Sequence, residues 1–404
     1  MKDFLRLVSL EEFYDFLYGF SPINECETVN IESCKGRVIK EDLFSPEDLP
    51  SYKRSSVDGY AVRYEDTVGA SYSSPVILKN KGEIEMGKIP SFSISVGETC
   101  YVPTGGALPE GTNAVVMIEN TEKNADMVEI YKQVTYEENI ILEGEDFKKD
   151  QILLQSGQRI FSKDIGALAA LGAKNLSVYS LPVVKIFSTG NEIVEKKTNK
   201  YQIRDSNSYT IASILERFSN VKRMGILKDN FDEIYDNIKE IYDESDIIVL
   251  SGGSSMGVRD YTLETFAKFG EPIYQIHGVR IKPGKPTIVY ITKEKIFIGL
   301  PGHPVSSFIS GVFVLLPLVK KYGGERNFTL KPQKYVKSNI RIPSQEGRKD
   351  FYRVKLNGEY FEPIFSKSSS LSSLLYGNGI IEIDENSEGI YEEETVPYYS
   401  LEDL

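Results

Sequence analysis

Three loops rich in Gly, Ser and Thr follow three strand-like runs in the second half of the sequence. The runs span residues 183–187, 246–250 and 296–300, and the loops span 188–192, 251–257 and 301–306. Glycine lets a backbone approach a ligand closely, and successive N–H groups form a cradle for an anion. Each loop alone also suits an ordinary strand-to-helix turn with a Ser or Thr cap. Together they indicate an anion or nucleotide site, because all three fall where a doubly wound sheet binds ligands.

A cationic segment precedes the third loop. Residues 277–292 contain Arg280, Lys282 and Lys285 and no acidic residue, which gives a local charge of +3 in a chain of net charge −12. The Pro-Gly pair between the lysines prevents a helix, so a tight turn could aim both ammonium groups at one oxyanion. Two surface lysines on a solvated turn are the alternative interpretation.

Five acidic residues could have a metal-binding or catalytic role: Asp58, Glu192, Asp205, Asp229 and Asp260. Hard cations such as Mg²⁺ use one or two carboxylates together with substrate phosphates. For each aspartate, a helix cap or a turn is the alternative. Asp229 in particular precedes a predicted helix at 230–242 and is a plausible cap for it.

The elements that would position these residues follow from the hydrophobic pattern. Strands and helices alternate from residue 183, which predicts a doubly wound α/β domain of about 140 residues. Short β-like runs separated by Gly, Pro and Asn predict a small β domain at 48–146 and another β domain after residue 324. Ser9 and Glu12 form a capping box that starts a helix.

One long apolar stretch, residues 296–319, contains no charged residue. Pro and Gly interrupt it, so it does not fit a membrane span. Its second half predicts a buried helix that ends at Lys320-Lys321 and Gly323-Gly324.

The composition excludes several classes of protein. An acidic chain of 404 residues is a poor bulk binder of nucleic acid or of an anionic membrane. Two His and three Cys, without a Cys-x-x-Cys spacing, fit neither a zinc cluster nor a disulfide framework. We therefore expect a reducing, cytoplasmic location, and the charged N-terminus does not resemble a signal peptide.

An ordered set of motifs resembles the molybdopterin molybdenumtransferases, the MoeA family, which is related to the C-terminal region of gephyrin. The motifs occupy residues 55–61, 103–111, 115–119, 144–146, 187–192, 251–257 with 260–261, 281–286 and 299–306. This resemblance implies the last step of molybdenum cofactor synthesis: Mg²⁺-dependent insertion of molybdate into adenylylated molybdopterin, with release of AMP. The alternatives are a molybdopterin adenylyltransferase and a dimeric scaffold like gephyrin.

The resemblance also implies roles for individual residues. Catalytic roles would fall to Asp58, Glu192, Asp229 and Asp260, of which Asp229 and Asp260 would place the metal. The pterin and its phosphate would contact Ser251, Gly252, Gly253 and Ser255. The molybdate pocket would comprise Lys282, Lys285, Pro286 and Ser306, with Arg353 and Ser368 added from the C-terminal domain. The protein would be a homodimer with its active cleft between the subunits, and Asp58 and Thr104 would reach that cleft from the partner subunit.

By the same resemblance, residues 1–25 form a helix that packs on the α/β domain at 181–325. Residues 26–47 and 147–180 form a small discontinuous domain, 48–146 an inserted β domain, and 326–404 a C-terminal β-barrel-like domain. Other cofactor-synthesis proteins are expected as transient partners, but not nucleic acid or a membrane. The sequence departs from the family pattern at Leu142-Glu143, where arginines are usual, at Asn191, where Asp is usual, and at His303, where Asn is usual.

Overall fold

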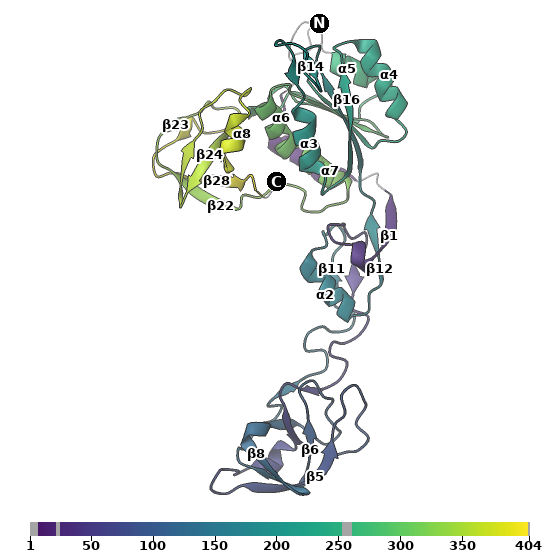
Figure 1. Ribbon diagram of the computed structural model, residues 1–404, viewed down its shortest axis with the longest axis vertical. Helices are drawn as coiled ribbons and strands as arrows, with labels where there is room; N and C mark the ends of the chain where they lie inside the picture. Colours follow the sequence, from purple (N-terminus) through teal and green to yellow (C-terminus); the bar gives the residue numbers. More distant parts are fainter. Residues whose placement is uncertain (1–6, 22–24, 253–260, 403–404) are drawn as a thin grey trace. The chain divides into compact units, whose positions relative to one another are not determined.

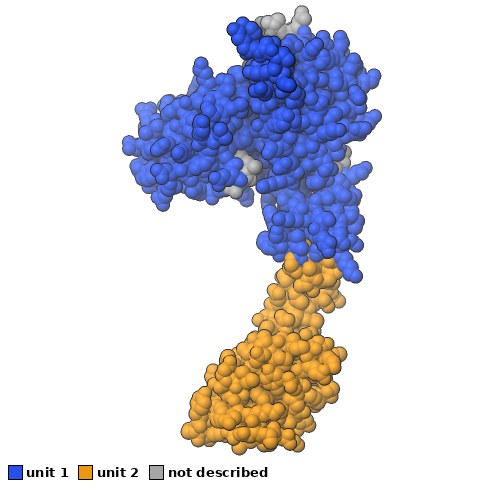
Figure 2. Space-filling view, viewed as in Figure 1, with its two compact units in different colours: residues 1–41, 156–165, 174–404 blue, residues 42–155, 166–173 orange. Residues whose placement is uncertain are grey.

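The computed structural model describes residues 7–21, 25–252 and 261–402, and the chain forms two compact units. The first unit comprises Met1–Glu41, Ser156–Ile165 and Lys174–Leu404, and the second comprises Asp42–Gln155 and Gly166–Ala173 (Figure 2). Separate hydrophobic clusters stabilise the two units.

A six-stranded sheet forms the centre of the first unit (Figure 1). Its strands in spatial order are β16 (Asn220–Leu227), β13 (Val183–Thr189), β17 (Ile247–Ser251), β21 (Ile296–Leu300), β20 (Ile288–Ile291) and β18 (Tyr274–His277). The first four are parallel, whereas β20 and β18 run antiparallel to their neighbours. The predicted alternation of strand and helix therefore ends at β20 and β21, which form a hairpin.

Helices cover both faces of this sheet, because alternate residues of its strands point to opposite sides. Ile247 and Val249 of β17 pack in one cluster with the helices α1 (Leu10–Gly19), α3 (Asn207–Leu215), α6 (Pro304–Ser310) and α7 (Leu316–Tyr322). Ile248 and Leu250 pack in another with α4 (Phe231–Ile241) and α5 (Tyr261–Phe266), which a 3₁₀ turn, Ala267–Phe269, extends. This arrangement confirms the predicted doubly wound α/β fold.

Helix α1 begins as its sequence predicts. The Ser9 hydroxyl accepts a hydrogen bond from the Glu12 N–H, and the Glu12 carboxylate accepts one from the Ser9 N–H. Phe13 and Leu17 are fully buried, and the Phe16 ring stacks 3.6 Å from that of Tyr274 beside the sheet. Val8, just before the helix, pairs with Val279 and so lies against the cationic segment.

The predicted buried helix runs over Pro304–Tyr322 through α6, a π-helical turn at Gly311–Leu315, and α7. Pro317 has no N–H to donate to the carbonyl of Phe313, four residues earlier. The Tyr14 hydroxyl of α1 donates to that carbonyl instead, at 2.7 Å. Among the described residues, this is the one helix long and apolar enough to cross a membrane, and 83% of its most apolar window is buried inside the protein.

Five strands close into a barrel in the C-terminal part of the first unit. They are β24 (Lys349–Asn357), β25 (Tyr360–Pro363), β22 (Lys334–Ser338), β28 (Thr395–Ser400) and β26 (Gly379–Ile383), and β26 pairs back to β24. Helix α8 (Ser372–Tyr376) and the pair β23 (Ile342–Pro343) and β27 (Gly389–Ile390) complete the barrel region. The predicted C-terminal β-barrel-like region is thus confirmed.

A pair of stacked rings and a pair of short strands help to join the barrel to the α/β part. The Phe351 ring of β24 stacks 4.2 Å from the Phe313 ring in the long helix. The short strand β19 (Ile281–Lys282) of the cationic segment pairs in parallel with β24. The barrel is therefore packed directly against the segment that carries Lys282 and Lys285.

Short elements complete the first unit. Strand β1 (Cys26–Asn30) pairs with β12 (Asn175–Tyr179), β14 (Ile193–Val194) pairs with β15 (Ile203–Arg204), and a 3₁₀ turn covers Ile31–Ser33. Helix α2 (Ser162–Ala170) begins in this unit, and its last residues, from Gly166, belong to the second unit.

The second unit is built on a six-stranded sheet (Figure 1). Its strands in order are β7 (Ala114–Met117), β4 (Gly59–Val62), β6 (Glu98–Val102), β5 (Val76–Glu83), β9 (Met127–Ile130) and β8 (Thr121–Asn124). Two small pairs, β3 (Arg54–Ser55) with β10 (Ile140–Ile141) and β2 (Leu43–Phe44) with β11 (Ile152–Leu154), and 3₁₀ turns at Tyr64–Thr67 and Ile118–Asn120 complete it. The finer division of the chain into four domains stays a prediction.

The three cysteines are free thiols. Cys34 and Cys100 are buried and Cys26 is exposed. Burial raises the pKa of the Cys100 thiol to about 12, so this thiol is unreactive at neutral pH.

Candidate oxyanion-binding site

The turn between Lys282 and Pro286 lies at the ligand-binding edge of the central sheet. It enters β20, which runs antiparallel to β21, so it lies where β21 ends. Gly284 has φ +124°, and a side chain there would meet Ile281 and the Ser310 hydroxyl at 2.7 Å. The Thr287 hydroxyl donates to the Gly284 carbonyl at 2.7 Å and lies 2.7 Å from the hydroxyl of Ser310 in α6, which fixes the turn against that helix. Only glycine fits this tight packing.

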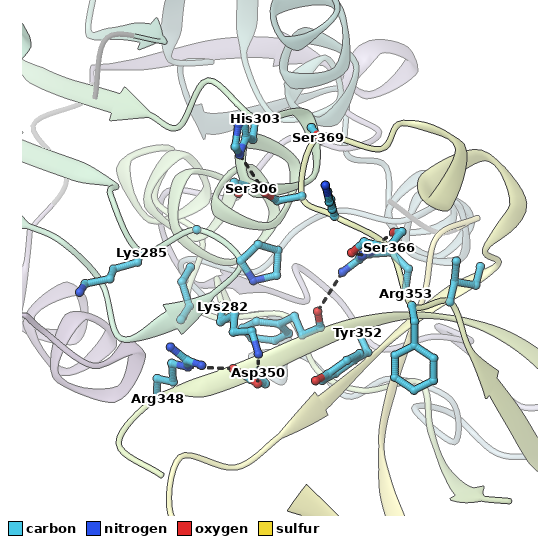
Figure 3. Close-up of a pocket in the computed structure, with 18 of the residues that line it drawn as sticks. Lys282, Lys285, His303, Ser306, Arg348, Asp350, Tyr352, Arg353, Ser366 and Ser369 are labelled. Atoms are coloured by element: carbon cyan, nitrogen blue, oxygen red, sulfur yellow. Dashed lines mark hydrogen bonds and ion pairs between the residues drawn. The ribbon is translucent and has the colours of Figure 1, made fainter. Parts of the chain in front are cut away.

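A cavity of about 680 Å³ opens between this turn and the barrel (Figure 3). Its wall includes five cationic side chains and one carboxylate: Lys282, Lys285, Arg348, Arg353 and Lys367, with Asp350. Predicted residues Pro286, Ser306 and Ser368 also line it. The structure therefore brings together every residue predicted for the molybdate pocket.

Arg353 is the most deeply buried cation in the wall, with 5% of its surface exposed. Its guanidinium donates to the Ser366 carbonyl at 3.1 Å and hydroxyl at 2.9 Å, to the Ser373 hydroxyl at 3.3 Å and to the Phe351 carbonyl at 3.4 Å. No carboxylate within the described ranges pairs with it. Burial lowers the pKa of Arg353, although a guanidinium keeps its charge at any physiological pH. A buried charge without a counter-ion favours the binding of an anion.

The two lysines of the turn differ in their surroundings. Lys282 Nζ lies 3.0 Å from Asp350, which also pairs with Arg348 at 3.2 Å. Figure 3 shows the Lys285 side chain leaving the turn away from that cluster. The two ammonium groups therefore do not point at one spot as expected, because β19 directs Lys282 toward β24 while the Lys285 side chain leaves the turn on another side.

A loop of the barrel meets the start of α6 at the other side of the cavity. The Val305 N–H donates to the Ser368 carbonyl at 3.0 Å, and His303 Nδ1 lies 2.8 Å from the Ser368 hydroxyl. His303, at the position where the family usually has Asn, thus links the start of α6 to the barrel loop. Ser306 is 6% exposed and also lines the cavity.

Ser251 marks the end of β17 and is buried. Its hydroxyl accepts a hydrogen bond from the Asn207 amide at 3.0 Å and lies 3.4 Å from that of Ser307. The same Asn207 amide donates to the Gly302 carbonyl at 2.9 Å, so Asn207 ties two of the predicted loops together. Gly252 has φ +113°, and a side chain there would overlap the Thr189 carbonyl. Gly253, Ser255 and Asp260 lie outside the described residues.

Two predicted carboxylates, Glu192 and Asp229, follow the neighbouring strands β13 and β16. Strand β13 extends to Thr189, so the predicted loop at 188–192 starts later, at Gly190. Burial raises the pKa of Asp229, the Asn191 N–H opposes this, and the charge of Glu192 raises it further. Asp229 does not cap α4, since Asn230 accepts the Glu233 N–H at 3.0 Å.

The remaining candidates have other surroundings. Asp205 is a structural residue, because its carboxylate accepts hydrogen bonds from Ser188 and from the start of α3 at Ser208. In the second unit, Asp58 accepts the Thr104 N–H at 2.8 Å, and both residues are exposed. The structure thus brings these two predicted residues together on one surface.

Three family models match successive parts of the chain. The model of the MoeA N-terminal region (domain I and II) covers residues 8–172, that of a probable molybdopterin binding domain 185–321, and that of the MoeA C-terminal region (domain IV) 335–401. A molybdopterin biosynthesis protein of Methanocaldococcus jannaschii is 37% identical over 385 residues, 92% of each chain. The chain belongs to the MoeA family.

Other MoeA relatives are similar to this chain in sequence and in structure. A molybdopterin molybdenumtransferase of Haemophilus influenzae is 31% identical over 333 residues and 81% of each chain. The solved structure of a MoeA protein from Pyrococcus horikoshii superimposes with a TM-score of 0.84 at 30% identity, over 97% of this chain and 99% of that one. Gephyrin of Dictyostelium discoideum is 31% identical over 86% of this chain, but only 54% of its own length.

Several residues of this MoeA cavity were not predicted from the sequence: Arg348, Asp350, Lys367 and Ser366. The sequence does hold one relevant pattern. Arg348 and Asp350 are two residues apart, which places both on one side of an extended strand. Asn207 was also missed, because its two partners are 44 and 95 residues away in the sequence.

Proposed function

We propose that this MoeA protein inserts molybdenum into molybdopterin and that the cavity in Figure 3 binds the molybdate. The relatives named molybdopterin molybdenumtransferase support the activity. The observation that carries the site is Arg353, a buried cation whose described partners are all neutral. Molybdate is a dianion, and the fixed cations of the wall would offset the cost of removing it from water.

The hydroxyls of the wall complement these cations. Ser306, Ser366 and Ser368 line the cavity beside them, and hydroxyl groups can donate to oxyanion oxygens. We infer that Arg353 and Lys282 supply the charge while these serines orient the ion. Lys285, whose side chain is exposed, would attract the ion as it enters.

The pterin and its phosphate would lie at the end of β17, near Ser251 and Gly252, with Gly253 and Ser255 following in sequence. The Gly252 backbone allows close approach of a ligand, because a side chain there is excluded. We propose adenylylated molybdopterin as the form bound, with AMP as the leaving product.

We propose that Asp229 and Asp260 would hold a divalent cation that also binds substrate phosphates, with the Glu192 charge nearby. Among the described residues no group of three or more His, Cys, Asp or Glu is placed to hold a metal alone, but two neighbouring carboxylates suffice for Mg²⁺ bound with phosphate. When bound, Mg²⁺ would neutralise charge on the phosphoanhydride. Burial raises the pKa of Asp229, and a cation bound beside it would favour the ionised carboxylate.

We also propose the homodimer, in which the Asp58–Thr104 surface of one subunit would reach the cleft of the other. The cytoplasmic location and the transient partners of cofactor synthesis stay predictions. Residues of the barrel region, such as Asp350 and Arg353, line the cavity. An adenylyltransferase usually needs only the single α/β domain, so this lining supports molybdenum insertion over that alternative.

One experiment tests this function. The purified protein is incubated with adenylylated molybdopterin, molybdate and Mg²⁺, and AMP is measured together with the reconstitution of a molybdenum apoenzyme. We expect stoichiometric AMP and active cofactor, both reduced in Asp229→Asn. No AMP release would overturn the proposal. Consumption of ATP with molybdopterin would favour the adenylyltransferase, and intact cofactor synthesis in cells with Arg353→Met would favour the scaffold.

A further inference from the structure

Asp350 is the one carboxylate among the residues that line the cavity. Its side chain is fully buried, and it bonds Lys282 Nζ at 3.0 Å and Arg348 Nε at 3.2 Å. Figure 3 shows the three side chains meeting at one wall of the cavity. A negative charge thus lies inside a site whose other charges suit an anion.

The fold holds this carboxylate firmly in place. Asp350 lies on β24 and is the register partner of Lys282 on the parallel strand β19. The neighbouring Lys349 donates its N–H to the Arg280 carbonyl at 2.9 Å, and its ammonium pairs with Glu11 of α1 at 2.6 Å and with Glu382 of β26 at 2.5 Å. The strand pairing with β19 and the contacts of Lys349 therefore hold Asp350 in place.

Two opposite effects on a bound oxyanion follow from this geometry. Asp350 orders Lys282 and Arg348, which prepares them to meet a ligand at low entropic cost. Its own charge repels an anion, and repulsion is strong where little water screens it. Without Asp350, the five cations of the wall would act unopposed.

We propose that Asp350 is a positioning residue that also limits the affinity of the cavity for the oxyanion. This inference rests on the proposed function, in which the cavity binds the molybdate that is then transferred to the pterin. Binding that stabilises the ion equally before and during transfer gives no gain in rate once the site is filled. By weakening binding, the Asp350 carboxylate allows the bound oxyanion to dissociate from the cavity.

Molybdate titration calorimetry on the full chain at one fixed ionic strength tests this proposal. The variants are Asp350→Asn, which keeps the shape and loses the charge, and Asp350→Glu, which keeps the charge. Glu392→Gln is the matched control, because it removes one negative charge from an exposed position of the barrel region that does not line the cavity.

We expect Asp350→Asn to lower the Kd for molybdate at least tenfold, about 1.4 kcal/mol, and to slow dissociation. Asp350→Glu should bind within about threefold of the wild type, as should Glu392→Gln. A purely structural role predicts weaker binding in Asp350→Asn, and weaker or unchanged binding would overturn the inference. Absence of binding by the wild-type protein would instead overturn the proposed molybdate site.

A second pair of variants covers the case in which Asp350→Asn does not fold. Lys282→Gln is compared with the double variant Lys282→Gln/Asp350→Asn, which removes both members of the ion pair and leaves the net charge of the wall unchanged. The double variant should bind molybdate more tightly than Lys282→Gln alone. Equal or weaker binding by the double variant would contradict the proposal.

Discussion

Two arginines of the first unit are both largely buried, yet their surroundings differ. The Arg159 guanidinium lies 2.7 Å from the Glu325 carboxylate, which Lys320 also contacts at 3.3 Å. Arg353 meets only hydroxyls and carbonyls among the described residues. The charge of Arg159 is neutralised by Glu325 within the fold. Arg353 lines a cavity, and no described carboxylate neutralises its charge.

This difference separates a structural charge from one that is available to a ligand. Placing an ion in the interior is costly, and an internal partner offsets that cost permanently. For a buried ion with neutral partners, this cost is offset only when a ligand of opposite charge binds. We therefore expect Arg159 to matter for stability and Arg353 for oxyanion binding.

The largest expected effect is that of Arg353→Met on molybdate affinity. Because the variant removes the deepest cation of the cavity, the Kd should rise at least a hundredfold, about 2.7 kcal/mol. The free energy of unfolding should stay constant or increase, since an uncompensated charge leaves the interior. Calorimetry and urea denaturation measure the two quantities, and a large loss of stability with intact binding would reverse the assignment.

Arg159→Met should show the opposite pattern. It leaves Glu325 buried with Lys320 as its remaining partner, so the free energy of unfolding should fall by about 3 kcal/mol. The affinity for molybdate should not change, because Arg159 does not line the cavity. If this variant lost molybdate binding while its urea midpoint stayed the same, the comparison would fail.

The two turn lysines refine the comparison within the cavity itself. Lys282→Gln should weaken molybdate binding about tenfold, since Lys282 is ordered by Asp350. Lys285→Gln should weaken it only about twofold, and this loss should vanish at high salt, because no ion pair among the described residues orders its ammonium group and its exposed charge is screened. An equal loss in the two variants at every salt concentration would show that both ammonium groups contact the ion.

The smallest effect concerns Asp229, whose carboxyl pKa is raised by burial and by Glu192. A carboxyl whose pKa is higher in the folded state destabilises the fold when it ionises. Asp229→Asn should therefore raise the Tm slightly at pH 7, and the gain should disappear as the pH falls through the folded-state pKa. A gain that persists at low pH would assign the effect to a cause other than ionisation.

The sequence predicted those features that depend on local patterns. Examples are the Ser9–Glu12 capping box, the apolar helix before Gly323 and the β-branched run of β17. Each is formed by residues that are close together in the sequence, so its structure follows from their spacing. The start of α4 does not follow from the sequence, because Asp229 and Asn230 are both good caps and only the backbone decides which side chain accepts the Glu233 N–H.

Features that depend on distant partners could not be predicted. Lys282 and Asp350 are 68 residues apart, and their pairing depends on the register of β19 against β24. The neutral surroundings of Arg353 come from the loop at Ser366 and from α8, whose positions no local pattern specifies. The family resemblance named Arg353, but its burial without a counter-ion emerged only from the structure.

The most direct test of the molybdate site is a crystal of the protein soaked with molybdate and measured at the molybdenum absorption edge. The account predicts one anomalous peak in the cavity, within hydrogen-bonding distance of the Arg353 guanidinium and beside Lys282 and Ser306. A crystal of Arg353→Met treated in the same way should lose that peak. An anomalous peak at another place in the wild-type protein, with none in the cavity, would contradict the assignment.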